Sequence, residues 1–524
     1  MNIQIKNSYN LFFKFFFSIF PFLLISGPFL PDLFISIISL FFIIYCIIYK
    51  KIFFFKKKLI IFFLIFYLYI NVNSFFSFIP IVSFSTTLPY IRIILFSVFT
   101  AYLLSNITNL KKIIFYSFFF SYVVLFCDSL IQLMSGQNIL GYPIINSRIS
   151  SFFGGKLIMG SYVTKVLPIL LAITYFENFK YSNLLRFLCV SLAGILVFLS
   201  AERTASFFYI FTVAVYLILL PNKKQIIINF SLLFLLFVAM SFIKPSSVNK
   251  IYQSTLEQIF EKKTAKEKGF NIFSYRHEMH YLTAYKMFMD RTLIGHGVKS
   301  FRYLCDDSRY STKNKIIDDN KIFAPINGYV FIILGEATIL YLVPIEKKNE
   351  FIENLEKFNI RELNKINFNA HRILDSFAEN NSIYKFTNYN KTLLLFNVQD
   401  STYVNKGDYI FSSNDHANGC NTHPHNIHLQ ILAETGLIGY FFLFSFIIYL
   451  IAQFFKVTIN IIFKKELKNK RKNLSFLFIL LSLIQALFPI IPSGNIFNNW
   501  ISVLFFFQLA FLFNYLYYNK KINK

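Results

Sequence analysis

The sequence predicts an all-α polytopic membrane protein with about twelve transmembrane helices and one large polar loop. Of its 524 residues, 56% are hydrophobic and 20% aromatic, and only 15% carry a charge. Soluble domains carry roughly 25% charged residues, and one soluble core cannot bury this much Phe and Ile, whereas lipid can. The charged residues are also grouped between long apolar stretches, which is the pattern of a chain that crosses a bilayer repeatedly. Disordered, collagen-like and coiled-coil classes are excluded by the same composition.

The transmembrane helices are predicted from length and hydropathy. A bilayer core about 30 Å thick requires roughly 20 apolar residues per helix. Stretches of about that length occupy residues 11–27, 30–49, 59–78, 88–105, 113–134, 159–176, 184–200, 205–220, 225–243, 432–455, 474–492 and 497–517.

The distribution of charge predicts the orientation of these helices. The formal net charge of +26 suggests a nucleic-acid surface only if the placement of the basic residues is ignored. Outside residues 244–426 the chain holds 28 basic and 6 acidic residues, and the basic ones cluster after every second apolar stretch. Lys and Arg stay on the cytoplasmic side of a bilayer, so we expect both termini there. The clusters include Lys50, Lys51, Lys56, Lys57, Lys58, Lys111, Lys112, Lys180, Arg186, Lys223 and Lys224.

Three regions follow from this arrangement. Residues 1–243 hold nine predicted helices, residues 244–431 form a loop on the opposite side of the membrane, and residues 432–524 hold the last three helices and a cytoplasmic tail. Within the loop we predict a small α+β insertion at about 306–419. Runs with strand composition at 329–334, 339–343 and 392–398 lie around a charged helical stretch at 346–379.

The segment from Cys420 to Gly439 is the most informative part of the chain. Three of the eight histidines, His423, His425 and His428, stand within six positions directly before a predicted helix. An imidazole exchanges protons near neutral pH, so this placement suits a general base. Gly436 and Gly439 allow close contact between helices.

Two other interpretations of this segment remain open. The three histidines are dense enough to bind zinc, although no Cys or carboxylate stands at the customary spacing. They also fit a solvated polar cap on a helix. Glu434 either orients His425 or packs within the following helix.

The same segment resembles the signature of the O-antigen ligase and O-antigen polymerase family. His425 and Asn426, nine further residues and then Gly436-x-x-Gly439 reproduce its pattern, with Tyr440 where ligases often have Thr or Val. Further resemblance lies in residues 200–206, 274–278 and 295–301, and in 148–154, where Ser151 replaces a common Gly. The resemblance covers about 120–304 and 420–515 and leaves the insertion out.

This resemblance implies an O-antigen ligase of the bacterial inner membrane. Such an enzyme moves a glycan from an undecaprenyl-diphosphate carrier to lipid A-core at the periplasmic face, in lipopolysaccharide biosynthesis, with inversion and without metal or cofactor. It implies His425 as general base and places Arg203 and Arg276 on the diphosphate, which a guanidinium binds well.

Arg148, Asn426 and His423 are candidate substrate-binding residues. From the residues alone, Arg203 fits a snorkelling side chain, Arg276 a solvated one and Arg148 a contact between loops. Glu202 stands beside Arg203 as a candidate ion partner.

Alternative functions differ in the acceptor or in the class of protein. The same fold suits an O-antigen polymerase, which extends a lipid-linked chain, or a protein O-oligosaccharyltransferase. A transporter or flippase would carry charged residues in mid-span along its translocation path. Asp128 is nearly the only acidic residue in mid-span, so this class is less favoured.

The cysteines divide by compartment. Cys305 and Cys420 stand at the two edges of the insertion in the exported loop, where an oxidising periplasm permits a disulfide. We expect them to pair and to clamp the base of the insertion. Cys46, Cys127 and Cys189 fall within predicted helices as small apolar residues.

Overall fold

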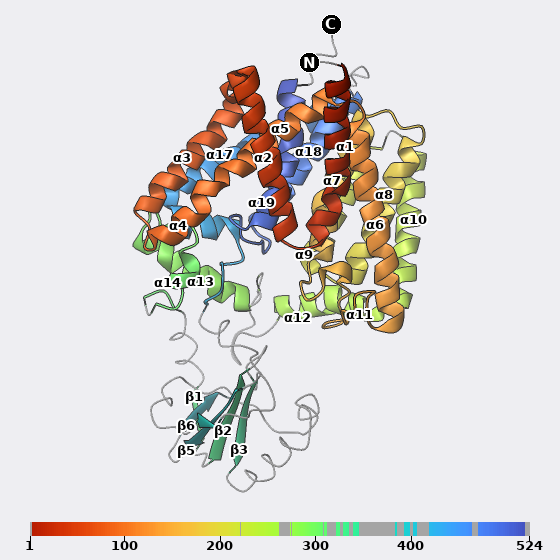
Figure 1. The fold of residues 1–524 in the computed structure, drawn as a ribbon. Coiled ribbons are helices and arrows are strands. Elements are labelled where there is room, and N and C mark those ends of the chain that lie inside the picture. The colour runs from red at the N-terminus through yellow and green to blue at the C-terminus, as the bar shows by residue number, and fades with distance from the viewer. Residues whose placement is uncertain are drawn as a thin grey trace. The chain divides into compact units, whose positions relative to one another are not determined.

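The computed structural model describes residues 3–518 except 221, 261–272, 274, 308, 312–320, 325–327, 335–338, 345–382, 385–391, 399–401, 406–418 and 464–469. The chain divides into two compact units. The helical unit comprises Met1–Ser274, Phe288–Ser300 and His425–Lys524, and the loop unit comprises Tyr275–Met287 and Phe301–Pro424 (Figure 1).

A long helix coincides with each apolar stretch of the helical unit. Ten of the described helices are long and apolar enough to cross a membrane, so this is a multi-pass membrane protein. The two remaining stretches correspond to α9, with 16 residues, and α18, with 17, which are shorter than these ten apolar spans. The helices are α1 (Ile3–Ile25), α2 (Phe29–Tyr49), α3 (Lys58–Phe75), α4 (Pro80–Thr87), α5 (Ile91–Asn106), α6 (Leu110–Ser135), α7 (Met159–Phe176), α8 (Ser182–Ser200), α9 (Arg203–Ile218), α10 (Lys223–Ile243), α17 (Ile427–Phe463), α18 (Lys470–Ala486) and α19 (Asn499–Phe513).

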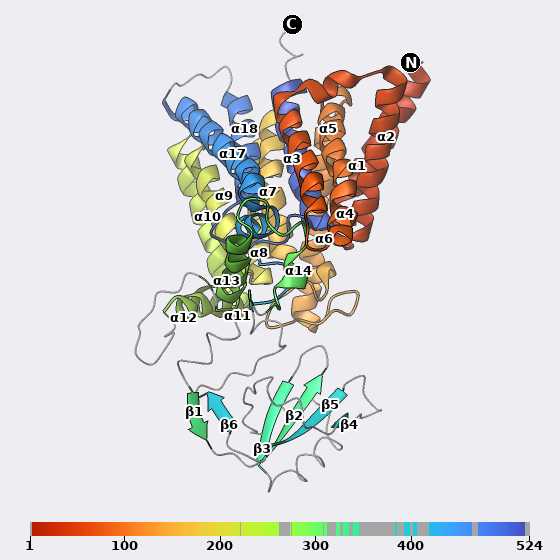
Figure 2. The same ribbon diagram turned by 90° about the vertical axis from the view of Figure 1, so that its left-hand side faces the viewer.

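The helices differ in how deeply they are buried among one another. In α7 83% of the apolar segment is buried inside the protein, against 6% in α10. α7 therefore lies in the interior of the helical unit and α10 at its periphery. Aromatic contacts join helices that are distant in sequence. α17 lies beside α3 (Figure 2), where Phe62 and Phe442 have ring centroids 5.5 Å apart.

Short helices follow α10. They are α11 (Pro245–Val248), a π-helical turn at Asn249–Gln253, α12 (Ser254–Phe260), α13 (Tyr275–Asp290) and α14 (Phe301–Leu304). α13 begins in the loop unit and ends in the helical unit.

The loop unit contains antiparallel strands (Figure 2). The strands are β1 (Lys321–Ala324), β2 (Gly328–Leu334), β3 (Ile339–Pro344), β4 (Ile383–Tyr384), β5 (Thr392–Val398) and β6 (Thr402–Asn405). One sheet has the order β3-β2-β5-β4, and β1 pairs with β6 in another. β2, β3 and β5 fall on the three runs with strand composition. The charged stretch 346–379 lies outside the described residues, so the mixed α+β character of the insertion stays a prediction.

Candidate functional site

Most of the candidate residues stand at one end of the helical unit, which we call the distal end. It is the end away from the first turn of α1 and the last turn of α19, and it comprises residues 136–158, 200–203, 243–244, 425–427 and 487–498 (Figure 1). Backbone hydrogen bonds join segments of this end that are far apart in sequence. The Ile149 amide donates to the Leu199 carbonyl (3.2 Å), and the Ser493 amide donates to the His425 carbonyl (2.8 Å).

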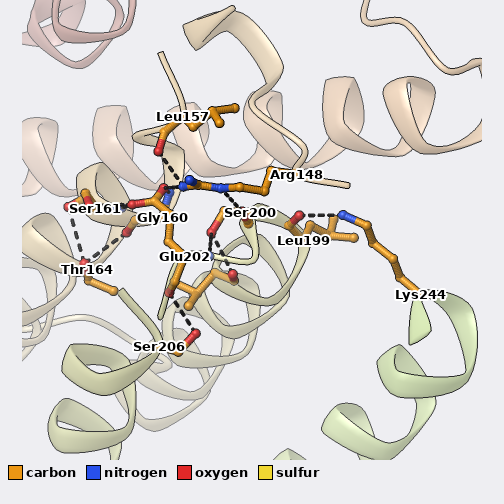
Figure 3. A network of polar contacts seen from close by, with 11 residues as sticks. Arg148, Leu157, Gly160, Ser161, Thr164, Leu199, Ser200, Glu202, Ser206 and Lys244 are labelled. Carbon is orange, nitrogen blue, oxygen red and sulfur yellow. Dashed lines mark hydrogen bonds and ion pairs between the residues drawn. The ribbon is translucent and has the colours of Figure 1, made fainter. Parts of the chain in front are cut away.

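Arg148 lies at the centre of a polar network at the distal end (Figure 3). Its Nε donates to the Ser200 carbonyl (3.1 Å) and its Nη2 to the Leu157 carbonyl (2.7 Å). Nη2 also lies 3.7 Å from Oε1 of Glu202. The structure thus assigns Arg148 the contact between loop and helix ends, and its role as a phosphate ligand stays a prediction.

Glu202 is a buried carboxylate that joins α7 to α9. Its Oε1 accepts from the Gly160 amide (2.7 Å), and its Oε2 accepts from the Ser161 amide (3.2 Å) and hydroxyl (2.6 Å). A carboxylate at the first turn of a helix is stabilised by the free N–H groups there. Burial nevertheless raises the pKa of Glu202, against these bonds and Arg148, which lower it. Glu202 forms an ion pair with Arg148, and its expected pairing with Arg203 stays a prediction.

Arg203 is the first residue of α9, and its side chain is exposed. It is close enough to Arg148 for the two positive charges to interact. Lys244 also interacts electrostatically with Arg148, while its Nζ donates to the Leu199 carbonyl (2.8 Å). Arg203 and Lys244 therefore lie near Arg148, and three cations grouped in this way favour binding of an anion.

His425 stands in a conformation that its neighbours hold in place. It has a left-handed φ of 54°, unfavourable by roughly 1–2 kcal/mol for an L-residue. Its side chain has intermediate exposure, although Pro424 and Asn426 on either side are buried. Backbone strain of this kind clusters at functional sites.

Asn426 caps the helix that follows His425. Its Oδ1 accepts from the amides of His428 (2.9 Å) and Leu429 (3.2 Å), and its Nδ2 donates to the Pro489 carbonyl (2.8 Å). These are the contacts of a helix N-cap. The predicted contact of Asn426 with substrate stays a prediction.

His428 is engaged at both ring nitrogens. Nε2 lies 2.9 Å from the Leu487 carbonyl and therefore carries the proton, while Nδ1 accepts from the Tyr440 hydroxyl (3.2 Å). This leaves neither nitrogen for a metal. Within the described residues no group of three His, Cys, Asp or Glu side chains is placed to bind a metal ion.

The residues at 487–489 bring the Arg203 and His425 segments together. Phe488 packs against Phe207 and Phe208 in the first turns of α9, with ring centroids 5.6 and 5.9 Å apart. Its neighbours Leu487 and Pro489 accept the hydrogen bonds from His428 and Asn426. The beginnings of α9 and α17 therefore both contact one short segment.

The Gly436-x-x-Gly439 motif marks a kink in α17. Gly436 has φ 65° and ψ −168°, so the helical hydrogen bonds are interrupted there. The amides of His296 and Gly297 donate to the carbonyls of Ala433 (3.0 Å) and Glu434 (2.7 Å), and those of Leu437 and Ile438 donate to the carbonyls of Thr292 (2.8 Å) and Leu293 (3.2 Å). The segment 292–297 thus replaces the backbone bonds that the kink removes.

Close packing explains the glycines and Glu434. A Cβ on Gly295 would lie 2.6 Å from the backbone of Glu434, and one on Gly439 would lie 2.0 Å from Oγ1 of Thr435. Glu434 is fully buried and accepts from Nε2 of Gln430 (3.1 Å). These contacts show that Glu434 packs within α17, and its predicted orientation of His425 stays a prediction.

The loop unit holds the other candidates. Cys305 and Cys420 form a disulfide with their Cα atoms 4.8 Å apart. Nδ1 of His423 lies 3.0 Å from the Thr422 hydroxyl. Arg276 stands in the first turn of α13. The predicted substrate contacts of His423 and Arg276 stay predictions.

Sequence reasoning missed several residues that shape the helical unit. Asp128, expected in mid-span, is buried and accepts from the Ser151 hydroxyl (2.5 Å) and the Ile139 amide (3.0 Å), so it anchors the loop that carries Arg148. Ser493 and the 292–297 backbone carry no sequence signal of their contacts. Lys165 does carry one, because it stands alone within the apolar stretch 159–176.

Comparison with known proteins shows a likeness to one family over part of the chain. Residues 188–334 match the family model described as O-antigen ligase. The match includes Arg203 and Arg276 and ends within the predicted insertion, before His425. No curated protein and no solved structure matches the chain. Within residues 188–334, this multi-pass membrane protein is therefore similar to the O-antigen ligase family.

Proposed function

We propose that the protein is an O-antigen ligase that transfers a glycan from undecaprenyl diphosphate to lipid A-core at the periplasmic face of the bacterial inner membrane. The observation that carries the proposal is the convergence of two motif segments, the start of α9 with Arg203 and the start of α17 with His425, on residues 487–489. The family match over 188–334 supports the same class of membrane glycosyltransferase.

The proposed chemistry needs one base and cationic contacts. His425 takes the proton from the attacking hydroxyl of the acceptor, whose oxygen forms the new bond to the anomeric carbon. The bond from that carbon to the diphosphate oxygen breaks, and undecaprenyl diphosphate leaves. Arg203 stabilises the charge that develops on the diphosphate, and Arg276 is predicted to do the same. Attack opposite the leaving group inverts the anomeric centre.

The strained backbone of His425 supports its role as the base. The Ser493 amide donates to the His425 carbonyl, and the Asn426 side chain donates to the Pro489 carbonyl. The backbone that carries the imidazole is therefore held by two hydrogen bonds. Such preorganisation is expected of a group that must meet a hydroxyl at hydrogen-bond distance.

The test is transfer in proteoliposomes that contain the purified protein, undecaprenyl-diphosphate glycan and lipid A-core, with EDTA present. We expect glycosylated lipid A-core, and a loss of about 10²- to 10⁴-fold in rate for His425→Ala, the usual contribution of a general base. His371→Ala, at a histidine of the insertion outside the motifs, is the matched control. For Arg203→Ala the control is Arg302→Ala, at an exposed arginine.

Other products decide between the alternatives. Longer carrier-linked chains with unmodified lipid A-core would identify a polymerase. Glycosylated protein acceptors would identify a protein O-oligosaccharyltransferase. Equal rates for His425→Ala and the unsubstituted protein would refute the proposed mechanism.

A further inference from the structure

Lys165 carries a positive charge inside the most buried helix of the protein. It lies within α7, one turn and a half from the distal end, between the buried residues Thr164 and Val166. Among the described residues its amino group has no hydrogen bond and no ion pair, and it lies 5.9 Å from the centroid of the Trp500 ring. A charge at this depth is costly, and ionisable residues inside membrane helices usually mark functional sites.

The side chain of Lys165 lines a cavity of about 10 Å³ together with Ile427, Leu487, Ile496, Phe505 and Gln508. Nε2 of Gln508 donates to the Lys165 carbonyl (2.7 Å), and its Oε1 is buried with no partner in the described part of the chain. The cavity therefore has polar groups whose hydrogen bonds are unfilled. Its volume suits about one water, so a larger ligand has to stay outside it.

The position of Lys165 links the two halves of the candidate site. Ser161, which binds Glu202, precedes Lys165 by four residues and thus shares its face of α7. Glu202 interacts electrostatically with Lys165. On the other side of the cavity, Ile427 follows His425 by two residues and Leu487 binds His428. Lys165 therefore lies between the cationic cluster at Glu202 and the start of α17.

We propose that Lys165 is a further substrate-binding residue, whose ammonium contacts a phosphate oxygen of the lipid-linked diphosphate. The inference rests on the proposed function. The polyprenyl chain of such a donor extends into the bilayer, so its phosphates lie between lipid and glycan. A flexible four-carbon stem lets the ammonium leave the cavity towards the distal end, and lysine binds phosphate as a point charge.

The proposal predicts opposite effects on stability and on binding. In Lys165→Met the charge within α7 is replaced by an apolar side chain of similar length, so we expect a thermal midpoint in detergent at or above that of the unsubstituted protein. Binding of undecaprenyl diphosphate without glycan should weaken about 10- to 100-fold, the usual value of a hydrogen bond to a charged group. The donor KM should rise by a similar factor with a smaller change in kcat.

A matched control is Lys111→Met. Lys111 is likewise a lysine in a helix of the bundle, but its Nζ donates to the Leu104 carbonyl (2.9 Å) near the first turn of α6, away from the distal end. We expect Lys111→Met to bind the diphosphate normally. Vesicles of phosphatidylglycerol, added to the binding assay, distinguish a lipid headgroup from the carrier as the ligand of Lys165. If the headgroup were the ligand, the vesicles would compete with undecaprenyl diphosphate.

The outcomes separate this proposal from the proposed function. Equal diphosphate binding by Lys165→Met and the unsubstituted protein would refute the role of Lys165 while glycan transfer stands. Joint loss of stability and binding would also refute it, since that is the result of a structural lysine. Diphosphate binding that depends on Lys165, in a protein that transfers no glycan, would support the contact and overturn the proposed ligase.

Discussion

Replacement of Gly436 by Ala is expected to destabilise the helical unit by about 3–5 kcal/mol. The φ of 65° and ψ of −168° lie in a region that is almost restricted to glycine, so Ala adds a strain of roughly 1–3 kcal/mol. A Cβ at this position would also lie 2.3 Å from the carbonyl oxygen of Leu293 and 2.5 Å from the amide nitrogen of Ile294. Both are backbone atoms of the 292–297 segment, so the segment itself has to move.

The second contribution comes from the hydrogen bonds that such a movement breaks. Four backbone bonds join 292–297 to the kink, at 2.7–3.2 Å. Loss of two of them, at about 1 kcal/mol each, adds roughly 2 kcal/mol to the strain. The effect should therefore exceed that of most single substitutions.

The assay is thermal unfolding of the purified protein in detergent, combined with hydrogen exchange of the amides at His296, Gly297, Leu437 and Ile438. Gly155→Ala is the matched control, because a Cβ there meets nothing within 4 Å. The free energies of unfolding of Gly436→Ala and Gly155→Ala could differ by less than about 0.5 kcal/mol while all four amides stay protected. In that case the 292–297 segment does not restrict residue 436 to glycine.

Three further predictions concern the distal end. In Gly160→Ala, the new Cβ would lie 2.4 Å from the Ser200 hydroxyl and 3.1 Å from Oε1 of Glu202, so we expect the start of α9 to shift. The kcat/KM for glycan transfer should then fall at least about tenfold, whereas the control Gly155→Ala should leave it unchanged. Asn426→Ala removes the cap of α17 and should lower the free energy of unfolding by about 1–2 kcal/mol in denaturant titration; an unchanged midpoint would contradict the capping role. Burial, reinforced by Arg148, lowers the pKa of Lys244 from 10.5 to about 8. Between pH 8 and 10.5 the unfolded chain binds more protons at Lys244 than the folded protein does. The free energy of unfolding should therefore rise with pH in this range, by up to about 1.4 kcal/mol per pH unit. Lys244→Met should lack this rise when thermal midpoints are measured from about pH 8 to 10.

The membrane helices were predictable because lipid imposes a local requirement. Each crossing must satisfy its own backbone and must be apolar over about 20 residues, and both properties can be counted along the chain. The strand runs at 329–334, 339–343 and 392–398 were predictable for a related reason, since β-branched and aromatic composition is local.

The partners within the candidate site were not predictable in the same way. His425 could be selected from its motif, but the bonds that hold its segment come from residues 489 and 493, more than 60 positions later. The ion pair of Glu202 with Arg148, 54 positions earlier, forms because α7 and α8 place the loop before α7 against the end of α8.

The sequence alone therefore determined the class of protein and the positions of the helices, since composition and length are properties of neighbouring residues. The resemblance to a family selected Arg203 and His425. Only the tertiary structure decided that Gly436 is a kink completed by 292–297, that Asn426 is a helix cap and that Lys165 lies between the two motif segments. Those contacts join parts of the chain that are distant in sequence, and packing of the helices is what brings them within hydrogen-bond distance.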